Sequence, residues 1–368
     1  MGENGAGKTN ILEALSLFSP GRGLRRADLG DIIRKPLKSG NIPQQQVTHQ
    51  ELKDSSPSGF SVAITLETDY GEKRLGTGGV QSESLNKGIQ RVHRVDGVPV
   101  SSASAFSEYV RVLWLTPDMD GLFRGSAGER RRFLDRLVLA IDKEHGTRVN
   151  ALERALRSRN RILEENPDQY RWLDAIEKEI AELGIAVTLA RRETVERLSS
   201  LIEQTHKETS PFPFAVLEIQ GDLDRLVQEQ AAADVEERYQ ALLRQNRLRD
   251  RAAGRTLIGP QASDLAVRHG PKNVAAEYAS TGEQKALLVG LILAQAHLIK
   301  TMSGIAPLVL LDEISAHLDR KRREALFSGL EEFSGQVWIT GADKQAFQDL
   351  KPHADIFEVT NSFLHPVC

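Results

Sequence analysis

The feature that most restricts how this chain can fold is a phosphate-binding loop that begins at its second residue. The loop matches G-x-x-x-x-G-K-[ST] at every constrained position and consists of Gly2, Glu3, Asn4, Gly5, Ala6, Gly7, Lys8 and Thr9. Glycines in such a loop let successive backbone N–H groups point at phosphate oxygens. Lys8 is predicted to reach the β- and γ-phosphates of a nucleotide, and Thr9 to bind Mg²⁺ through its hydroxyl. Residues 10–15 are predicted to continue as a helix whose positive end favours the anion.

Length, charge and cysteine content narrow the class of protein. The 368 residues are 40% hydrophobic and 27% charged, which predicts a packed core in one large or two modest domains. The formal net charge is −3, so a nucleic-acid surface would have to be a local patch. The only cysteine, Cys368, excludes an internal disulfide and fits a reducing cytoplasm.

No segment is expected to cross a membrane. The N-terminus lacks the charged-then-apolar pattern of a signal peptide. The longest apolar stretch, 286–299, contains Gln295 and His297 and is shorter than a bilayer requires. We therefore predict a soluble cytoplasmic protein without a membrane partner.

Hydrophobic periodicity places strands toward the two ends of the chain and helices in its middle. The predicted strands are 61–66, a hairpin around Asp96-Gly97, 110–115 before Pro117, 308–311 and 337–340. The predicted helices run from about 130 to 206, with a break at Asn166-Pro167, and then over 236–251 and 280–299. The break predicts an antiparallel helix pair. A helical block thus interrupts an α/β pattern.

An apolar strand that ends in two acids is the second strong motif. Leu308 to Leu311 is followed by Asp312 and Glu313. Successive strand residues point to opposite sides, so the two carboxylates can have different roles. Asp312 is placed to hold Mg²⁺, and Glu313, as the catalytic residue, to orient and polarise the water that attacks the γ-phosphate.

Ser280-Thr281-Gly282-Glu283 is the third motif, and by itself it is more typical of an ordinary helix cap than of a nucleotide site. The order of motifs along the chain favours a functional role for this segment. The chain has first the phosphate loop, then a long insertion, this helix start, the acidic strand end and finally Leu318-Asp319. That is the order of ABC-type ATPases, in which the serine motif of one subunit closes over the nucleotide of the other. Ser280 and Gly282 are therefore predicted to bind nucleotide.

These motifs predict an α/β fold: an ABC-type P-loop ATPase head with a helical second lobe. The ATP-binding lobe is expected to comprise residues 1–118 and 300–368. The mainly helical lobe, which carries the serine motif, is expected to comprise residues 119–299.

Several blocks resemble the RecF family of DNA replication and repair ATPases, over Gly2 to about Thr340. Besides the phosphate loop and residues 280–285, the matching blocks are 115–118, Arg130 to Asp135, Arg157 to Asn160, and Gly259-Pro260 followed by Asp264-Leu265. The resemblance implies ATP and Mg²⁺ as ligands and an ATP-dependent homodimer with weak ATPase activity. It also implies binding of duplex DNA at gapped or junction sites and partnership with the mediators RecR and RecO in loading recombinase.

The chain departs from the family pattern in three places. The family has the first strands of the sheet before the phosphate loop, so we expect a misassigned start or a truncated gene, with loss of ladder hydrogen bonds and core. Gln261-Ala262 stands where the family usually has His-Arg, which removes a cation. No histidine follows the strand at 337–340, where transporters carry a γ-phosphate sensor; Thr340 and Asp343 are both candidates to replace it.

Five arginines are candidate DNA contacts, each with a plainer alternative. Arg22, Arg25 and Arg26 lie in a predicted loop near the nucleotide and are either phosphate contacts or solvent-exposed side chains. Arg130 and Arg131 either contact DNA or form a solvent-facing helix start with Asp135 as a local partner. The arginines between 244 and 251 are more typical of an exposed helix end.

Two rival functions remain open from the sequence alone. A transporter ATP-binding subunit is the first, although the missing sensor histidine and the long helical lobe argue against it. A truncated pseudo-ATPase is the second, since the expected first strands are absent.

Overall fold

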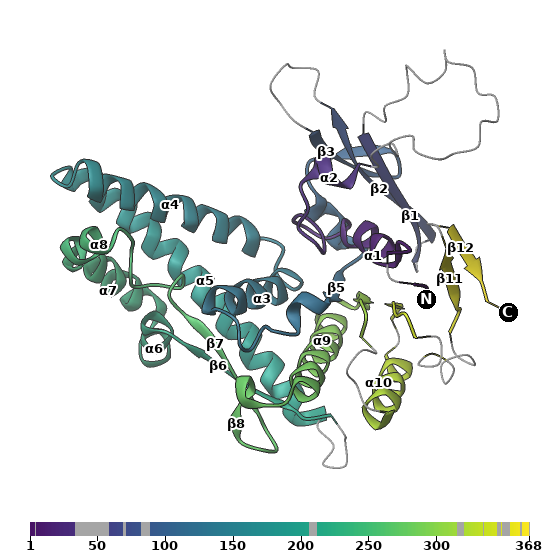
Figure 1. Ribbon diagram of the computed structural model, residues 1–368. Coiled ribbons are helices and arrows are strands. Elements are labelled where there is room, and N and C mark those ends of the chain that lie inside the picture. The colour runs from purple at the N-terminus through teal and green to yellow at the C-terminus, as the bar shows by residue number, and fades with distance from the viewer. Residues whose placement is uncertain are drawn as a thin grey trace.

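Figure 1 shows the fold as a computed structural model of the 368-residue chain. The structure describes residues 1–3, 5–33, 59–68, 71–81, 89–205, 212–314, 320–333, 335–343, 347, 354–360 and 363–367. The predictions made for Asn4, for Leu318-Asp319 and for Cys368 lie outside these residues.

A parallel sheet lies at the centre of the molecule. Its strands are β5 (Val112–Leu115), β9 (Leu308–Leu311) and β10 (Val337–Ile339), in the order β10-β9-β5. Their side chains alternate between two hydrophobic cores: Trp114 and Leu310 pack toward one, Leu115 and Leu311 toward the other. Burial on both faces explains why these strands are continuous apolar runs. The strands predicted at 110–115 and 308–311 are confirmed, and the chain turns into a short 3₁₀ helix at Pro117.

One face of this sheet is covered by α1 (Lys8–Ser16) and an antiparallel sheet. That sheet contains, in order, β1 (Gly59–Thr68), β2 (Gly71–Gln81), β3 (Ile89–Val95) and β4 (Val98–Val100). Asp96 and Gly97 both have positive φ, 49° and 82°, as a two-residue type I′ hairpin requires, so the predicted hairpin is confirmed. Leu12 of α1 and Phe106 of a 3₁₀ turn (Ala103–Glu108) fill the core between the layers. A short helix, α2 (Leu29–Ile32), touches β3.

The helical region lies on the other side of the sheet and extends from there into an arm (Figure 1). It comprises α3 (Ala127–Leu139), α4 (His145–Glu165), α5 (Tyr170–Thr205), α6 (Asp222–Glu229), α7 (Ala232–Gln245) and α8 (Arg247–Ala253). Helices α4 and α5 run side by side from the break at Asn166-Pro167, which confirms the predicted antiparallel pair. The single helix predicted over 236–251 is wrong. It is split at Asn246 (φ −92°, ψ 6°), whose side chain donates to the carbonyl of Leu242 and so competes with the helical backbone.

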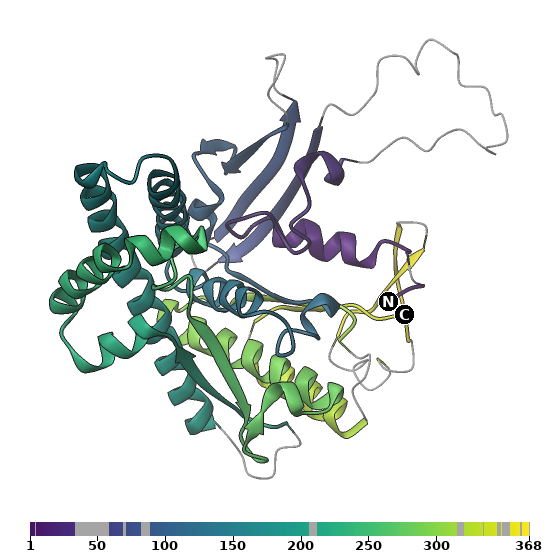
Figure 2. The same cartoon turned by 60° about the vertical axis from the view of Figure 1, so that its left-hand side comes forward.

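Helix α9 (Thr281–Ser303) is the core helix that joins the two regions. It packs against α5, β5 and β6 (Ala215–Gln220), and β6 forms a small antiparallel sheet with β7 (Asp264–His269) and β8 (Val274–Ala275) (Figure 2). The helix is longer than predicted, and its length and composition would suffice to cross a bilayer. However, most of its apolar side chains, Leu291 and Ile292 among them, are buried in the largest core of the described residues, as expected of a core helix.

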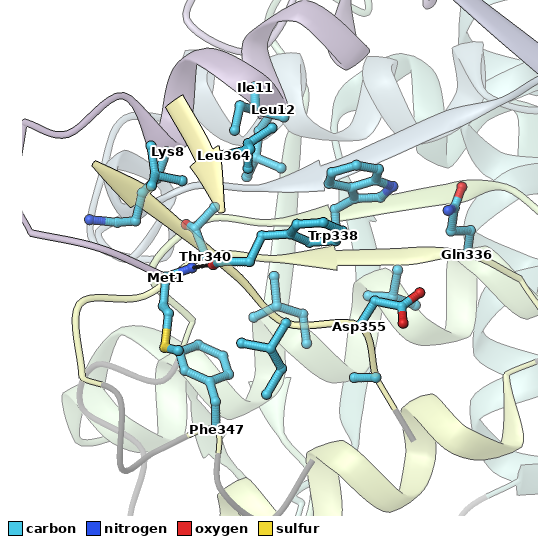
Figure 3. A pocket seen from close by; sticks show the side chains of 16 residues that line it. Met1, Lys8, Ile11, Leu12, Gln336, Trp338, Thr340, Phe347, Asp355 and Leu364 are labelled. Carbon is cyan, nitrogen blue, oxygen red and sulfur yellow. Dashed lines mark hydrogen bonds between the residues drawn. The ribbon is translucent and has the colours of Figure 1, made fainter. Parts of the chain in front are cut away.

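The C-terminal part returns to the phosphate loop. After α10 (Arg320–Glu332), strands β11 (Phe357–Thr360) and β12 (Phe363–Pro366) form a hairpin. The backbone of Met1 pairs with β11: its amine donates to the carbonyl of Phe357 at 2.6 Å, and its carbonyl accepts from the N–H of Val359 at 2.7 Å. A cavity of about 380 Å³ lies between α1, β10 and this hairpin, with Leu12, Trp338 and Leu364 in its wall (Figure 3).

Candidate nucleotide site

Glycine backbone geometry shapes the phosphate loop. Gly5 and Gly7 have φ of 83° and 105°, in the left-handed region that favours glycine. A side chain at Gly2 would lie 2.5 Å from the carbonyl oxygen of Val359, so only glycine fits there. Lys8 starts α1, and its buried ammonium donates to the carbonyls of Gly2 at 2.7 Å and Glu3 at 2.8 Å. The lysine therefore lies within its own loop, at the place where the sequence predicts phosphate.

The fold brings Thr9 and Asp312 together, although they are far apart in the sequence. The Thr9 hydroxyl lies 3.1 Å from both carboxylate oxygens of Asp312, at the C-terminal end of β9. Asp312 is 6% exposed. Both are hard oxygen ligands of the kind Mg²⁺ prefers. Among the described residues no group of three or more acidic, histidine or cysteine side chains could hold a metal by itself.

Glu313 adopts a backbone conformation that is uncommon outside glycine. Its φ is 49°, and neighbouring side chains hold both of its peptide groups. Its N–H donates to the Thr340 hydroxyl at 3.1 Å, and its carbonyl accepts from the Lys285 ammonium at 3.2 Å. The Thr340 hydroxyl in turn donates to Asp312 at 2.5 Å. Strained backbone of this kind concentrates at functional sites and persists only where its surroundings impose it.

Of the two residues suggested in place of a sensor histidine, Thr340 lies within the acidic site, whereas Asp343 is exposed farther along the chain. Lys285 was not singled out from the sequence. Its ammonium is buried against Asp120 at 3.2 Å and against the Glu313 carbonyl. The available signal was a lysine that directly precedes the long apolar run of this helix.

The serine motif forms a complete capping box at the start of α9. The Ser280 hydroxyl accepts from the N–H of Glu283 at 3.4 Å, and the Glu283 carboxylate accepts from the N–H of Ser280 at 3.1 Å. A hydrogen bond from Lys272, together with those from Ser280, lowers the pKa of Glu283 to about 2. Ser280 is exposed, and within the described chain neither it nor Gly282 is bonded to the phosphate loop. The motif thus caps its helix and also presents that helix end at the surface.

The loop that carries Arg22, Arg25 and Arg26 is fixed to α1. The N–H of Arg25 donates to the carboxylate of Glu13 at 2.9 Å, and the N–H of Leu24 donates to the Ser16 hydroxyl at 2.7 Å. Burial raises the pKa of Glu13. All three arginines are exposed, and Arg22 pairs with Asp28 at the surface.

Arg130 and Arg131 are tied into the helical region. Arg130 binds both carboxylate oxygens of Asp264, at 2.7 and 2.6 Å, and Arg131 donates to the carbonyl of Ser263 at 2.6 Å. Asp135 accepts instead from Arg191 and from His145. The alternative of a solvent-facing helix start paired with Asp135 is therefore wrong for Arg130, because its guanidinium is committed to β7.

Comparison with known proteins places the chain in a family. The family model described as the RecF/RecN/SMC N terminal domain matches residues 1–364. The DNA replication and repair protein RecF of Rhizobium rhizogenes strain K84 is 48% identical over 98% of this chain and 90% of its own length. RecF of Allorhizobium ampelinum is 49% identical over 99% of this chain and 91% of its own. The chain belongs to the RecF family.

Solved structures agree on the fold. The recombination mediator protein RecF of the RecFOR pathway, described in an ATP-bound form and in one designated RecF-ATPrS, superposes with TM-scores of 0.77 and 0.80. These matches cover 100% of this chain and 90% and 91% of the others, at 19% and 21% identity, so they establish the ABC-type head fold alone. With RecF relatives over nearly the whole chain, neither the transporter subunit nor the pseudo-ATPase is favoured.

Proposed function

We propose that this RecF-family chain binds ATP with Mg²⁺, closes as a dimer around the nucleotide and thereby binds DNA. The observation that carries the proposal is the meeting of Thr9 and Asp312 at 3.1 Å beside the buried Lys8. One solved RecF neighbour is described with ATP as its ligand, which supports the choice of nucleotide.

Each residue of the site would have a separate task. Lys8 would exchange its two carbonyl contacts for phosphate oxygens, and the backbone of Gly5 to Gly7 would donate to the same anion. Thr9 and Asp312 would hold Mg²⁺, which when bound neutralises charge on the phosphates. Glu313 would orient the attacking water, with Thr340 and Lys285 holding its backbone in place. Catalysis would rest on positioning, and we expect slow hydrolysis.

The second half of the site would come from another copy of the chain. Ser280 and Gly282 lie at an exposed helix N-terminus, where backbone N–H groups favour an anion. ATP would then bind the closed dimer better than the open one and shift the equilibrium toward closure. We assign ATP binding to residues 1–118 and 300–368 and the serine motif to residues 119–299.

In the cell this dimer would act in the cytosol in recombinational repair and replication. We propose duplex DNA at gapped or junction sites as its substrate and RecR and RecO as its mediator partners, because relatives are named for DNA replication and repair and the solved neighbours for the RecFOR pathway. Affinity for DNA would come mainly from phosphate contacts, of which Arg22, Arg25 and Arg26 are candidates, and would fall with salt.

Titration with trinitrophenyl-ATP tests the nucleotide assignment. Lys8→Met is expected to weaken nucleotide binding about a hundredfold, the cost of losing hydrogen bonds to charged phosphates. Lys143→Met is the matched control, because Lys143 is a surface lysine that pairs only loosely with Glu108 at 3.8 Å. Unchanged nucleotide affinity in Lys8→Met would refute the phosphate-loop assignment.

Fluorescence anisotropy with a gapped duplex, with and without ATP and Mg²⁺, tests the proposed ATP-dependent DNA binding. Binding is expected only when nucleotide is present, together with a doubling of mass in light scattering. A protein that remains monomeric and does not bind the duplex at saturating ATP would contradict the proposal.

A further inference from the structure

Three of the sequence blocks that the nucleotide site does not use meet at a cavity on the helical arm. The cavity has a volume of about 400 Å³, and its wall includes Arg131 of α3, Leu156 and Asn160 of α4, and Arg255, Thr256 and Gln261 of the loop after α8. These segments are far apart in the chain. Their convergence on one polar cavity is the starting point for the inference.

A buried network makes the floor of the cavity rigid. Arg159 is fully buried and donates to Asp250 and to the Thr256 hydroxyl, both at 2.8 Å. The Thr256 hydroxyl donates a hydrogen bond to the side-chain oxygen of Asn160 at 2.8 Å, and Asp250 accepts from the N–H of Leu257 at 3.1 Å. The loop that carries Arg255 is therefore already fixed before any ligand binds, which lowers the ordering cost of binding.

The same loop is held at its far end by two further side chains. Arg191 donates to the carbonyl of Pro260 at 2.6 Å, and Tyr239 donates to the carbonyl of Ile258 at 3.0 Å. Gln261 turns its amide nitrogen back onto the Ile258 carbonyl at 2.8 Å. The carbonyls of Ile258 and Pro260 are thus already hydrogen-bonded within the protein.

The unused polar groups at the cavity are donors on Arg131, Arg255 and Asn160 and one acceptor, the buried side-chain oxygen of Gln261. Arg131 uses only one of its N–H groups, toward Ser263, and the side chain of Arg255 and the side-chain nitrogen of Asn160 have no partner among the described residues. No carboxylate is among the lining residues, and neither arginine has an ion-pair partner within 4.0 Å in the described part of the chain. Burial is the main cause that lowers the pKa of Arg131; Arg191 acts in the same direction, and the carboxylates of Asp264 and Asp135 oppose it.

We propose that this cavity binds a phosphodiester group of the DNA backbone. Two guanidinium groups and an amide N–H₂ around a rigid concave wall match the several oxygens of a phosphate, which arginine binds through paired N–H groups. The phosphate contact carries no base information, so it adds affinity and register but not sequence preference. The inference rests on the proposed DNA binding and adds a second contact region on the helical arm.

A purely structural role accounts for only part of this arrangement. Holding the loop explains Arg159, Asp250 and Arg191, whose donors and acceptors are used within the protein. It does not explain Arg255, which contributes only its backbone N–H, to Asp250. An acidic segment of a partner protein could fill the same cavity, and the experiment separates that case.

The test measures duplex affinity by anisotropy over a range of salt concentrations, with ATP and Mg²⁺ present. Arg255→Gln removes one cation without touching the network, and Ala262→Arg adds one at an exposed position of the wall. Arg255→Gln is expected to reduce the slope of log K against log salt by about 0.9, which corresponds to roughly fivefold weaker binding at 0.15 M salt. Ala262→Arg should change both quantities in the opposite direction. Arg238→Gln, an exposed arginine of α7 outside the cavity, is the matched control.

The outcomes separate the cavity assignment from the proposed function. Wild-type binding with no change of slope in Arg255→Gln and Ala262→Arg would overturn the cavity assignment and leave the proposed function intact. No duplex binding by the wild type at any salt would overturn both. If the substitutions changed the affinity for inorganic phosphate or for an acidic partner protein but not for the duplex, the assignment of the cavity to DNA would be wrong.

Discussion

Helices α3 and α9 begin with the same local device and are connected to different parts of the molecule. In α3 the Ser126 hydroxyl accepts from the N–H of Glu129 at 3.3 Å, and the Glu129 carboxylate accepts from the N–H of Ser126 at 2.7 Å. The corresponding distances at Ser280 and Glu283 are 3.4 and 3.1 Å. Both starts carry the serine and glutamate of a capping box. The cap geometry alone therefore does not distinguish a nucleotide-closing motif from a structural one.

The two starts are adjacent, because Arg124, just before α3, donates to the carbonyls of Glu277 and Ala279 just before α9. They differ in the basic residue that follows. In α9 Lys285 reaches the carbonyl of Glu313, whereas in α3 Arg130 reaches Asp264 of β7. The contact made one turn into the helix, rather than the cap, links α9 to the acidic strand end.

The largest expected effect distinguishes the two caps directly. Ser280→Arg should leave ATP binding by the monomer intact but weaken ATP-induced dimerisation by about a hundredfold, because a bulky unpaired charge would enter the interface. Ser126→Arg should dimerise within a fewfold of wild type. Light scattering with ATP measures both. Normal dimerisation of Ser280→Arg would remove the trans role from α9 and make the two helix starts equivalent.

Replacing the basic residue of each helix should affect ATP turnover in α9 only. Lys285→Met should lower ATP turnover about tenfold, since it frees one peptide group of Glu313 and a lost hydrogen bond costs about 1.4 kcal/mol. Arg130→Met should leave turnover unchanged and lower the free energy of unfolding by about 2 kcal/mol, because Asp264 loses a charged partner. Steady-state ATPase assays and urea unfolding measure the two effects. Equal turnover in both variants would show that Lys285 does not act on Glu313.

Thr340 bonds the other peptide group of Glu313, the N–H, and its variants test whether this contact positions the acidic residues. Thr340→Val leaves the carboxylate of Asp312 and the N–H of Glu313 without the hydroxyl, so the Mg²⁺ concentration needed for tight nucleotide binding should rise about tenfold. Thr340→Ser should restore the wild-type requirement. Trinitrophenyl-ATP titrations at several Mg²⁺ concentrations measure it, and nucleotide affinity without Mg²⁺ serves as the control. An unchanged Mg²⁺ requirement in Thr340→Val would exclude this positioning role.

The smallest expected effect concerns the pH dependence of the two caps. Since the pKa of Glu283 falls from 4.5 to about 2 in the fold, its carboxylate stabilises the native state fully above pH 4.5, and this contribution is lost as the pH falls toward 2. The difference in unfolding free energy between wild type and Glu283→Gln should therefore shrink between pH 7 and pH 4. Hydrogen bonds from Ser126 lower the pKa of Glu129 too. Glu129→Gln should show a smaller difference, since among the described residues Glu129 has no ion partner comparable to Lys272. Urea denaturation at both pH values compares them, and a pH-independent difference would refute the coupling.

The sequence was sufficient where the determinants are local. Gly5 and Gly7 need positive φ, a capping box is read from four residues, and a two-sided buried strand is a continuous apolar run, so the phosphate loop, the start of α9 and β9 could all be predicted. The order of the motifs indicated the family.

The sequence was insufficient where partners are distant. Thr340 beside Asp312, Lys285 beside Glu313 and Arg130 on Asp264 are contacts between segments whose spacing carries no periodic signal. The break at Asn246 was missed because the spacing of apolar residues does not show that the Asn246 side chain bonds the carbonyl of Leu242. The bond of Arg130 to Asp264 was not among the alternatives considered, because the two residues are 134 positions apart in the chain.

The central sheet has a consequence for biosynthesis. Strand β5 lies at 112–115 and its neighbour β9 at 308–311, so a ribosome completes the first long before the second emerges. Until then the nascent polypeptide carries an apolar strand without its partner on that edge, a state prone to association with other chains. We expect chaperones to engage the growing protein during this interval, and native yield to depend on how promptly the final quarter is translated.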